Sequence, residues 1–287
     1  MVLPFVRELF TDVEKSPVLA RVASLLKSDT GRMRLSGLTP TAKALHYALL
    51  HKLSGRPLIV VVGDNRAAEE LVPVLQAFCE LTGSCAPETV AYLPARDVLP
   101  FENLSPHPEI QEARAQALWR VATGNVSILV VPFSSSAIRL RDAEFYAGLA
   151  RVVRKGETVE LDSLLAHLNT VGYAAADVVE MPGEYAMRGG ILDVYPPEAD
   201  RPLRLELFGD EIESIRKFDP GTQRSSLETD EAVLLPLTES PVTEELLGAI
   251  HVRLSGVPSR IDQEHRPHFP DVIEQKIELG VINRLSG

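Results

Sequence analysis

The first candidate for chemistry is a phosphate-binding loop at residues 63–70. It follows PLIVVVGD (57–64), a continuous apolar run of the kind that forms a strand buried on both faces of a sheet. A loop that cradles nucleotide phosphates has the pattern G-x-x-x-x-G-K-[ST]: backbone N–H groups and the lysine surround the phosphates, and the hydroxyl holds Mg²⁺. Here the sequence is GDNRAAEE, which lacks the second glycine, the lysine and the hydroxyl. Since Asp64, Glu69 and Glu70 add negative charge where phosphate would bind, we predict no ATP site and no cofactor.

Histidine and serine side chains form no catalytic pattern. His251, His265 and His268 lie near acidic residues and could be imagined as metal ligands. Prolines in the same segment break any helix that would align them, which favours a solvated loop. The serines at 134–136 follow an apolar run but lack the G-x-S-x-G pattern of a nucleophile. The sequence therefore predicts no catalytic residues and no metal site.

The composition is that of an ordinary globular protein with an acidic balance. The 287 residues are 45% hydrophobic and 24% charged, enough chain for two domains. A net charge of −11 argues against binding DNA or an anionic membrane with the whole surface, although it leaves room for a local basic patch. Cys79 and Cys85 fit reduced structural thiols. With no signal-peptide pattern and no apolar run that could span a bilayer, we expect a cytoplasmic protein without a membrane partner.

Residues 1–149 alternate between helix and strand patterns. We expect helices at 41–53, 66–83 and 107–125, and strands at 57–64, 89–94 and 127–135. Thr39 and Pro40 are placed to begin the first helix, and Gly83 to end the second. Strands separated by helices of this length form parallel βαβ units. This part therefore predicts an α/β domain built on a parallel sheet.

Residues 150–236 predict an α+β module with antiparallel strands. A short strand and a helix with Asp162 as its N-cap come first, and residues 183–215 then indicate three short strands. In 203–208, three leucines alternate with Arg204, Glu206 and Phe208, so an aromatic ring faces solvent if the leucines face the core. Gly209 and Asp210 are expected to form a two-residue hairpin turn. From residue 237 the chain returns to a helical pattern.

Two segments closely resemble one bacterial family. They are YLPARDVLPFENLSPHPEIQEAR (92–114) and GEYAMRGGILDVYPPEADRPLRLELFGDEIESIRKFDPGTQRS (183–225). Both are similar to the N-terminal, UvrB-like part of the transcription-repair coupling factors, the Mfd family, and matching segments run from about residue 39 to the end. The resemblance implies a degenerate nucleotide-hydrolase-like domain (1A) at 1–149 and a UvrA-binding module (domain 2) at 150–236. Residues 237–287 would be a small, truncated C-terminal domain (1B).

The resemblance implies an adaptor that recruits UvrA, linking stalled transcription to nucleotide excision repair without catalysis of its own. The alternative is a UvrB-like ATPase or helicase subunit, which carries an intact phosphate loop and a long aromatic hairpin that clamps DNA. This chain has GDNRAAEE for the first and only the short segment 93–110 for the second, and both departures fit the coupling factor. Full-length family members also bind RNA polymerase and double-stranded DNA, through domains for which these residues leave no room.

By motif, the family's UvrA-recognition residues fall on Arg188, Arg204 and Phe208. We add Glu206 and Asp210 as rim contacts to basic residues of UvrA. In the competing interpretation, Phe208 packs under a neighbouring loop and both arginines pair with Glu206, Asp210 or Glu211. A third interpretation, a DNA-binding regulatory module, conflicts with charge, because residues 151–219 carry eight Lys and Arg against fourteen Asp and Glu. That balance favours a protein partner.

Overall fold

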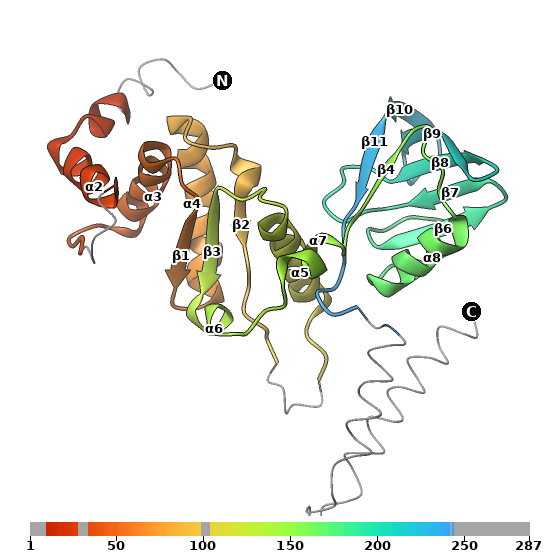
Figure 1. The fold of residues 1–287 in the computed structure, drawn as a ribbon, viewed down its shortest axis with the longest axis horizontal. Helices are drawn as coiled ribbons and strands as arrows, with labels where there is room; N and C mark the ends of the chain where they lie inside the picture. The colour runs from red at the N-terminus through yellow and green to blue at the C-terminus, as the bar shows by residue number, and fades with distance from the viewer. Residues whose placement is uncertain (1–9, 28–33, 99–103, 242, 244–287) are drawn as a thin grey trace, which may run out of the picture. The chain divides into compact units, whose positions relative to one another are not determined.

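The computed structural model describes residues 10–27, 34–98, 104–241 and 243 (Figure 1). Residues 1–241 form one compact unit and residues 242–287 a second, of which only Thr243 is described. The helical pattern expected beyond residue 241 therefore lies outside the described residues. Residues 237–241, which are described, form no helix.

The first part of the chain contains a parallel three-stranded sheet, as predicted. Its strands are β1 (Leu58–Val62), β2 (Val90–Tyr92) and β3 (Ile128–Pro132), in the order β1-β3-β2. Because all three run the same way, their carboxyl ends meet at one edge, which we call the carboxyl edge of the sheet. Residues 133–135, expected to continue the third strand, instead begin a short helix.

Three helices lie where the sequence predicts them: α3 (Pro40–Ser54), α4 (Asn65–Thr82) and α5 (Pro108–Ala122). The helix α2 (Pro17–Lys27) and the short turns η1 (Pro87–Thr89), α6 (Phe133–Ser136) and α7 (Ala143–Ala147) were not predicted. The Thr39 hydroxyl accepts a hydrogen bond from the Ala42 N–H at 3.3 Å, capping α3. Gly83 ends α4 with φ at 60°, in the left-handed region that glycine adopts without strain.

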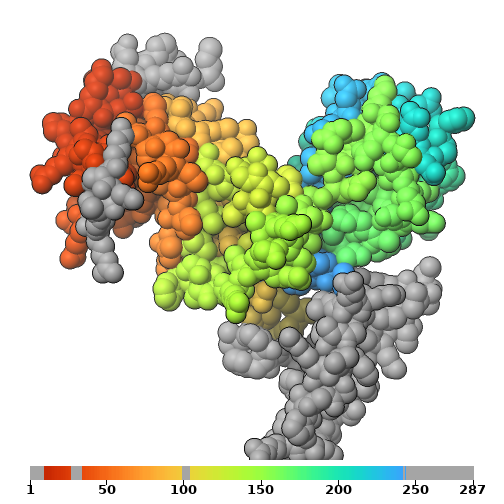
Figure 2. All heavy atoms as spheres, viewed as in Figure 1, coloured from red at the N-terminus to blue at the C-terminus, as the bar shows by residue number. Residues whose placement is uncertain are grey.

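Two hydrophobic clusters hold the helices to the two faces of the sheet. Buried residues of α3 and α4 pack with Val60, Val90 and Val130 on one face, and buried residues of α5 and α7 pack with Ala91 and Leu129 on the other. Side chains fill the space between the ribbons (Figure 2). The layer thus has helices on both faces, as an α/β domain requires.

Strand β1 differs from its prediction, because only one of its faces is buried. Ile59 and Val61 are 71% and 52% exposed, whereas Val60 between them is buried against α4. The cluster formed by α5 and α7 includes residues of β2 and β3, and β1 lies at the edge of the order β1-β3-β2. A continuous apolar run cannot tell a central strand from an edge strand that is covered on one face.

The second part is an α+β module of two antiparallel sheets and one helix. Its elements are β4 (Arg151–Arg154), α8 (Leu161–Thr170), β5 (Ala174–Ala175), β6 (Glu184–Arg188), β7 (Ile191–Val194), β8 (Leu203–Phe208), β9 (Glu211–Phe218), β10 (Ser225–Thr229) and β11 (Glu231–Leu234). A six-stranded sheet has the order β10-β9-β8-β7-β6-β5, antiparallel except for the β5–β6 pair, and β4 pairs with β11.

Two predictions about this module need correction. Residues 183–215 contain β6, β7, β8 and the start of β9, so four strands and not three cross this segment. The N-cap of α8 is Glu160, whose side chain makes no capping hydrogen bond, and Asp162 lies in the first turn instead. Asp162 is still well placed there, because a negative charge in the first turn of a helix is favourable.

One buried cluster unites α8 with the inner face of the six-stranded sheet. Leu164 and Leu168 of α8 belong to it, together with Leu192, Leu205 and Ile215 of the sheet. Leu192, Leu205 and Ile215 are cross-strand neighbours on β7, β8 and β9. The predicted inward position of Leu205 is therefore confirmed.

We predict that Leu205→Ala lowers the free energy of unfolding by about 2–5 kcal/mol, because it opens a cavity in this cluster. Leu227→Ala on β10 is the matched control. Leu227 is 61% exposed, so its truncation is expected to change stability by no more than about 0.5 kcal/mol. Urea unfolding of both variants tests the assignment of faces, and equal midpoints for the two would contradict it.

Candidate functional site

The outer face of the six-stranded sheet, opposite α8, carries the predicted site residues. Arg204, Glu206 and Phe208 lie on β8, Arg188 ends β6, and Asp210 lies in the turn between β8 and β9. Phe208 is 81% exposed, while the leucines at 203 and 205 are buried. The predicted alternation is confirmed, and Phe208 does not pack under a loop.

Backbone hydrogen bonds hold the hairpin that presents Phe208. Phe208 pairs with Glu211, which leaves Gly209 and Asp210 as the predicted two-residue turn. Gly209 has φ at 62°, and glycine adopts such left-handed conformations without steric cost. Within the turn, the Asp210 carbonyl accepts a hydrogen bond from the Val159 N–H at 2.7 Å. The hairpin tip is therefore tied to the segment before α8.

Arg188 stands at the solvent-exposed end of β6. Its guanidinium donates to the Asp177 carbonyl, which belongs to the preceding loop. Arg188 pairs across the β6–β7 hairpin with Ile191, and Ile191 pairs with Glu206 of β8. These three residues form one cross-strand row, and directly paired side chains share a face.

Arg204 lies in a different environment from the one expected. Its side chain is only 18% exposed. Its Nε and Nη2 atoms donate to the two carboxylate oxygens of Asp193 at 2.7 and 2.8 Å. Its guanidinium carbon lies 4.6 Å from the centre of the Phe218 ring. Arg204 is therefore part of the support beneath the exposed surface, and its acidic partner, Asp193, is none of those considered from sequence.

The two predicted rim residues are both accessible. Glu206 has a side chain 34% exposed, accepts a hydrogen bond from the Ser214 hydroxyl at 2.7 Å and lies 3.9 Å from Arg216. Asp210 is exposed in the hairpin turn. Both carboxylates lie on or beside the strand that carries Phe208.

Sequence reasoning missed two residues on the same outer face. Ile191 is 38% exposed, and the side chain of Arg216 is 42% exposed. Arg216 pairs with Arg204 across β8 and β9, so it joins the outer face by register. The Gly-Gly turn before Ile191 was the available signal, because it fixes where β7 begins and hence which of its residues point outward.

The carboxyl edge of the parallel sheet is occupied by the chain's own polar groups. Asp64 caps α4, its carboxylate accepting from the Ala67 N–H at 2.8 Å. Asn65 forms two hydrogen bonds with Ala95, one through each of its amide atoms, at 3.1 and 2.8 Å. The loop after β1 is thus engaged with the segment after β2, at the edge where parallel sheets commonly bind ligands.

A buried ion pair lies at the same edge. Arg114 of α5 is 1% exposed and forms a two-point contact with Glu239, at 2.6 and 3.0 Å. Arg114 also donates to the Ser135 hydroxyl at 2.8 Å and to the Pro94 carbonyl. Arg96 adds a second cation, 2.9 Å from the Glu239 carboxylate. We call these five residues the Glu239 cluster.

Charge keeps Glu239 ionised in this cluster. Burial by itself raises the pKa of the carboxyl, but the hydrogen bonds and charges of Arg114 and Arg96 outweigh it. The pKa of Glu239 therefore lies below its ordinary value of 4.5. The nearby Leu237 packs against the core of the α+β module, so the segment 237–239 contacts both parts of the unit.

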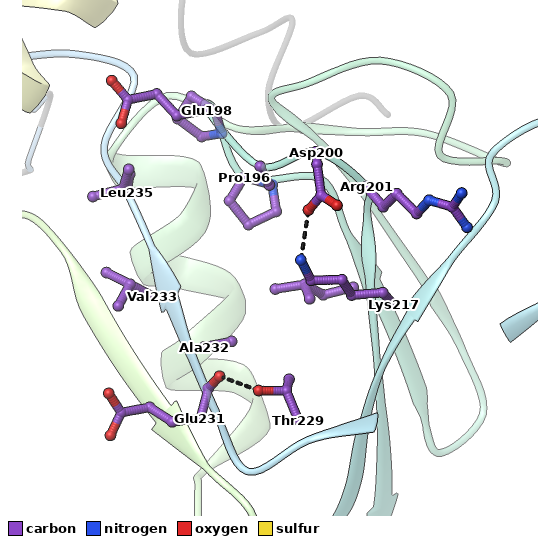
Figure 3. Close-up of a pocket in the computed structure, with 13 residues that line it drawn as sticks. Pro196, Glu198, Asp200, Arg201, Lys217, Thr229, Glu231, Ala232, Val233 and Leu235 are labelled. Atoms are coloured by element: carbon purple, nitrogen blue, oxygen red, sulfur yellow. Dashed lines mark hydrogen bonds and ion pairs between the residues drawn. The ribbon is translucent and has the colours of Figure 1, made fainter. Parts of the chain in front are cut away.

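A depression of about 490 Å³ lies beside β11 in the module (Figure 3). The Lys217 ammonium and the Asp200 carboxylate, both in its lining, are 2.5 Å apart. The Thr229 hydroxyl donates to the Glu231 carbonyl at 3.0 Å. Since these polar groups already have partners within the chain, the depression gives no specific indication of a ligand.

The part of the chain that the structure describes contains no group of three His, Cys, Asp or Glu residues that could hold a metal ion. The histidines at 251, 265 and 268 lie outside it. Cys79 and Cys85 are free thiols, and burial raises the pKa of Cys79 to about 12, as expected of a structural cysteine. Among the described helices, none is long and apolar enough to cross a membrane.

Comparison with known proteins assigns a domain to the region that carries the site. Residues 152–239 match the family model of the UvrB interaction domain. Most of the chain is similar to transcription-repair-coupling factors from Myxococcus xanthus (34% identity), Haemophilus influenzae (31%) and Escherichia coli (33%). These matches cover 80%, 86% and 74% of the chain, and 19%, 21% and 18% of the relatives. The chain thus spans about a fifth of their length.

We predict that Glu239→Ala lowers stability by about 3–5 kcal/mol at pH 7, because it leaves the Arg114 charge buried without its carboxylate. Since the folded-state pKa of Glu239 is depressed, the ion pair contributes fully above about pH 4.5 and is lost as the pH falls through the folded-state value. The difference in the free energy of unfolding between wild type and Glu239→Ala should therefore become smaller as the pH falls below about 4.5. Urea unfolding at several pH values measures this difference.

Glu231→Ala is the control for this prediction. Glu231 forms an ion pair with Arg154 in which both side chains are at least half exposed, and such pairs contribute about 1 kcal/mol or less. A Glu239→Ala variant no less stable than Glu231→Ala would show that the buried pair contributes nothing to the fold.

Proposed function

We propose that this homologue of the transcription-repair-coupling factors is an adaptor that binds UvrA through the outer face of its six-stranded sheet. The observation that carries the proposal is the exposure of Phe208, at 81%, on an anchored hairpin of the domain matched to the UvrB interaction domain. A phenylalanine held out of the core gains nothing for folding, and a partner surface would bury it.

The residue types on this face support a protein partner. Binding free energy in protein interfaces concentrates on aromatic residues and arginine, and Phe208 and Arg188 are both exposed here. Glu206 and Asp210 supply carboxylates nearby for basic groups of UvrA. The acidic balance of residues 151–219 argues against duplex DNA as the partner of this module.

We further propose that the chain performs no catalysis. Asp64 caps the N-terminus of α4, where a nucleotide-binding protein would receive phosphate, and it brings a negative charge there. Asn65 and the Glu239 cluster use the polar groups of the carboxyl edge for contacts within the chain. These features weigh against the UvrB-like ATPase or helicase.

The whole-protein role extends this proposal. In a longer chain of which these residues form about a fifth, the adaptor would link stalled RNA polymerase to nucleotide excision repair. Contacts with RNA polymerase and double-stranded DNA would then belong to other domains. A pull-down of the present chain with cognate UvrA tests the central step without them.

Phe208→Ala and Arg188→Ala are each expected to weaken UvrA binding by about 2 kcal/mol, roughly thirtyfold in Kd, as interface anchors do. Their thermal midpoints should stay close to that of wild type, because exposed side chains contribute little to folding. Calorimetric titration and thermal melts measure both quantities. A Phe208→Ala variant that binds UvrA like wild type would disprove the placement of the site.

Arg204→Ala is expected to behave differently from Arg188→Ala. It leaves Asp193 buried without its partner, so we predict a loss of about 3–5 kcal/mol in stability. Adding Asp193→Ala to this variant should recover part of that loss, since the uncompensated charge is removed. An Arg204→Ala variant with the wild-type midpoint would instead assign Arg204 to binding alone.

Neither wild type nor Glu69→Lys should hydrolyse ATP. The lysine restores one charge, but the loop would still lack the second glycine and the Mg²⁺-holding hydroxyl, and Asp64 and Glu70 would repel phosphate. Phosphate release and saturable Mg²⁺-ATP binding are the measurements, with heat-denatured protein as the blank. Phosphate release above that blank would favour the UvrB-like ATPase over the adaptor function.

A further inference from the structure

Ile191 is exposed at 38% at the start of β7, although an aliphatic side chain on a strand is usually placed to be buried. The pairing of β7 with β8 shows where Ile191 lies relative to Phe208. Ile191 pairs with Glu206, and Phe208 lies two residues further along β8 on the same face. Such diagonal neighbours have Cβ atoms about 7–8 Å apart, which an aromatic ring can bridge. The two exposed apolar side chains therefore belong to one patch.

Two arginines flank this patch. Arg188 pairs with Ile191 across the β6–β7 hairpin, and Arg216 lies on β9, 3.9 Å from Glu206. Both are substantially accessible, unlike Arg204. The border also contains carboxylates, because Glu206 pairs with Ile191 and Glu228 pairs with Arg216. The face thus offers two apolar side chains within a border of mixed charge, which fits a partner surface of apolar side chains bordered by charged groups.

The start of β7 is held closely against β8. The Leu207 N–H donates to the Gly190 carbonyl at 2.7 Å, and a Cβ atom added at Gly190 would lie only 2.8 Å from the Leu207 carbonyl oxygen. Glycine is required for this approach, because any side chain would collide with the backbone of β8. The hairpin carrying Arg188 and Ile191 is therefore fixed beside Leu207, the residue before Phe208.

We propose that Ile191 is a contact residue for UvrA and forms one apolar patch with Phe208, with Arg188 and Arg216 contacting carboxylates at its border. This inference rests on the proposed function, which names the partner but assigns neither Ile191 nor Arg216. Arg204 then acts beneath the patch, through Asp193, and does not contact the partner. We assign the patch to UvrA and not to a second copy of this chain because it lies within residues 152–239, which match the family model of the UvrB interaction domain.

The test compares Ile191→Ala with Leu227→Ala in titrations of the intact chain with UvrA. Leu227 is the matched control, an aliphatic residue 61% exposed on β10, two strands away from β8 in the same sheet. Ile191→Ala should raise Kd about tenfold without lowering the thermal midpoint, and Leu227→Ala should leave Kd unchanged. Because Ile191 and Phe208 would form one patch, the double variant should lose less than the product of the two single effects.

Arg216→Glu tests the charged border separately. Reversing this charge should lower affinity at low salt, and the deficit should shrink as ionic strength rises and screens it. Arg224→Glu makes the same two-unit change of charge at an exposed position just before β10, at the end of the sheet away from Phe208, and it should bind UvrA like wild type. Equal losses for the two variants would mean that only net charge matters and would overturn the role of Arg216.

The outcomes separate this inference from the proposed function. If Phe208→Ala weakens UvrA binding but Ile191→Ala does not, the adaptor function stands and the shared patch is wrong. If wild type does not bind UvrA, both fail. If gel filtration shows a dimer of this chain that Ile191→Ala dissociates, the patch serves self-association and the assignment to UvrA is overturned.

Discussion

Strand β8 can take only one register in its sheet, and the position of the candidate site depends on that register. Leu203 and Leu205 are buried, and side chains alternate between the faces, so a shift of one residue would expose both leucines. Exposing them would cost about 1.5–3 kcal/mol each. The two-residue turn after Phe208 fixes the pairing with β9, even though the register shifts between Glu206 and Leu207. The core thus decides which side chains a partner can reach.

The sequence predicted those features that depend on neighbouring residues. The cap at Thr39, the helix end at Gly83, the parallel direction of the first three strands and the alternation in β8 all follow from patterns of nearby residues, and all are present. Some failures were local, since Glu160 and not Asp162 lies at the N-cap of α8 and residues 133–135 begin a helix. Other failures involve groups far apart in the chain. Ile59 is exposed because of which helices cover the sheet, and Glu239 meets Arg114 across 125 positions. No local pattern contains that information.

Arginines at two positions of one recognition motif can serve different physical purposes. Arg188 lies at the surface, whereas Arg204 is nearly enclosed by Asp193 and the Phe218 ring. A sequence motif indicates only that both arginines are needed for recognition. It cannot tell an arginine that contacts the partner from one that supports the contacting surface. Burial and hydrogen bonding make that distinction. The candidate site therefore consists of exposed side chains, such as Arg188 and Phe208, and of a largely buried ion pair between Arg204 and Asp193 beneath them.

The Glu239 cluster places a carboxylate of the chain itself where other parallel sheets bind a diffusible ligand. A free ligand orders its site only in proportion to its concentration relative to its Kd. A tethered carboxylate has an effective concentration set by the length of the chain that carries it, and no metabolite level can change it. The contacts of Glu239 with Arg114 and Arg96 therefore form whenever the chain is folded, whatever the concentration of a free ligand.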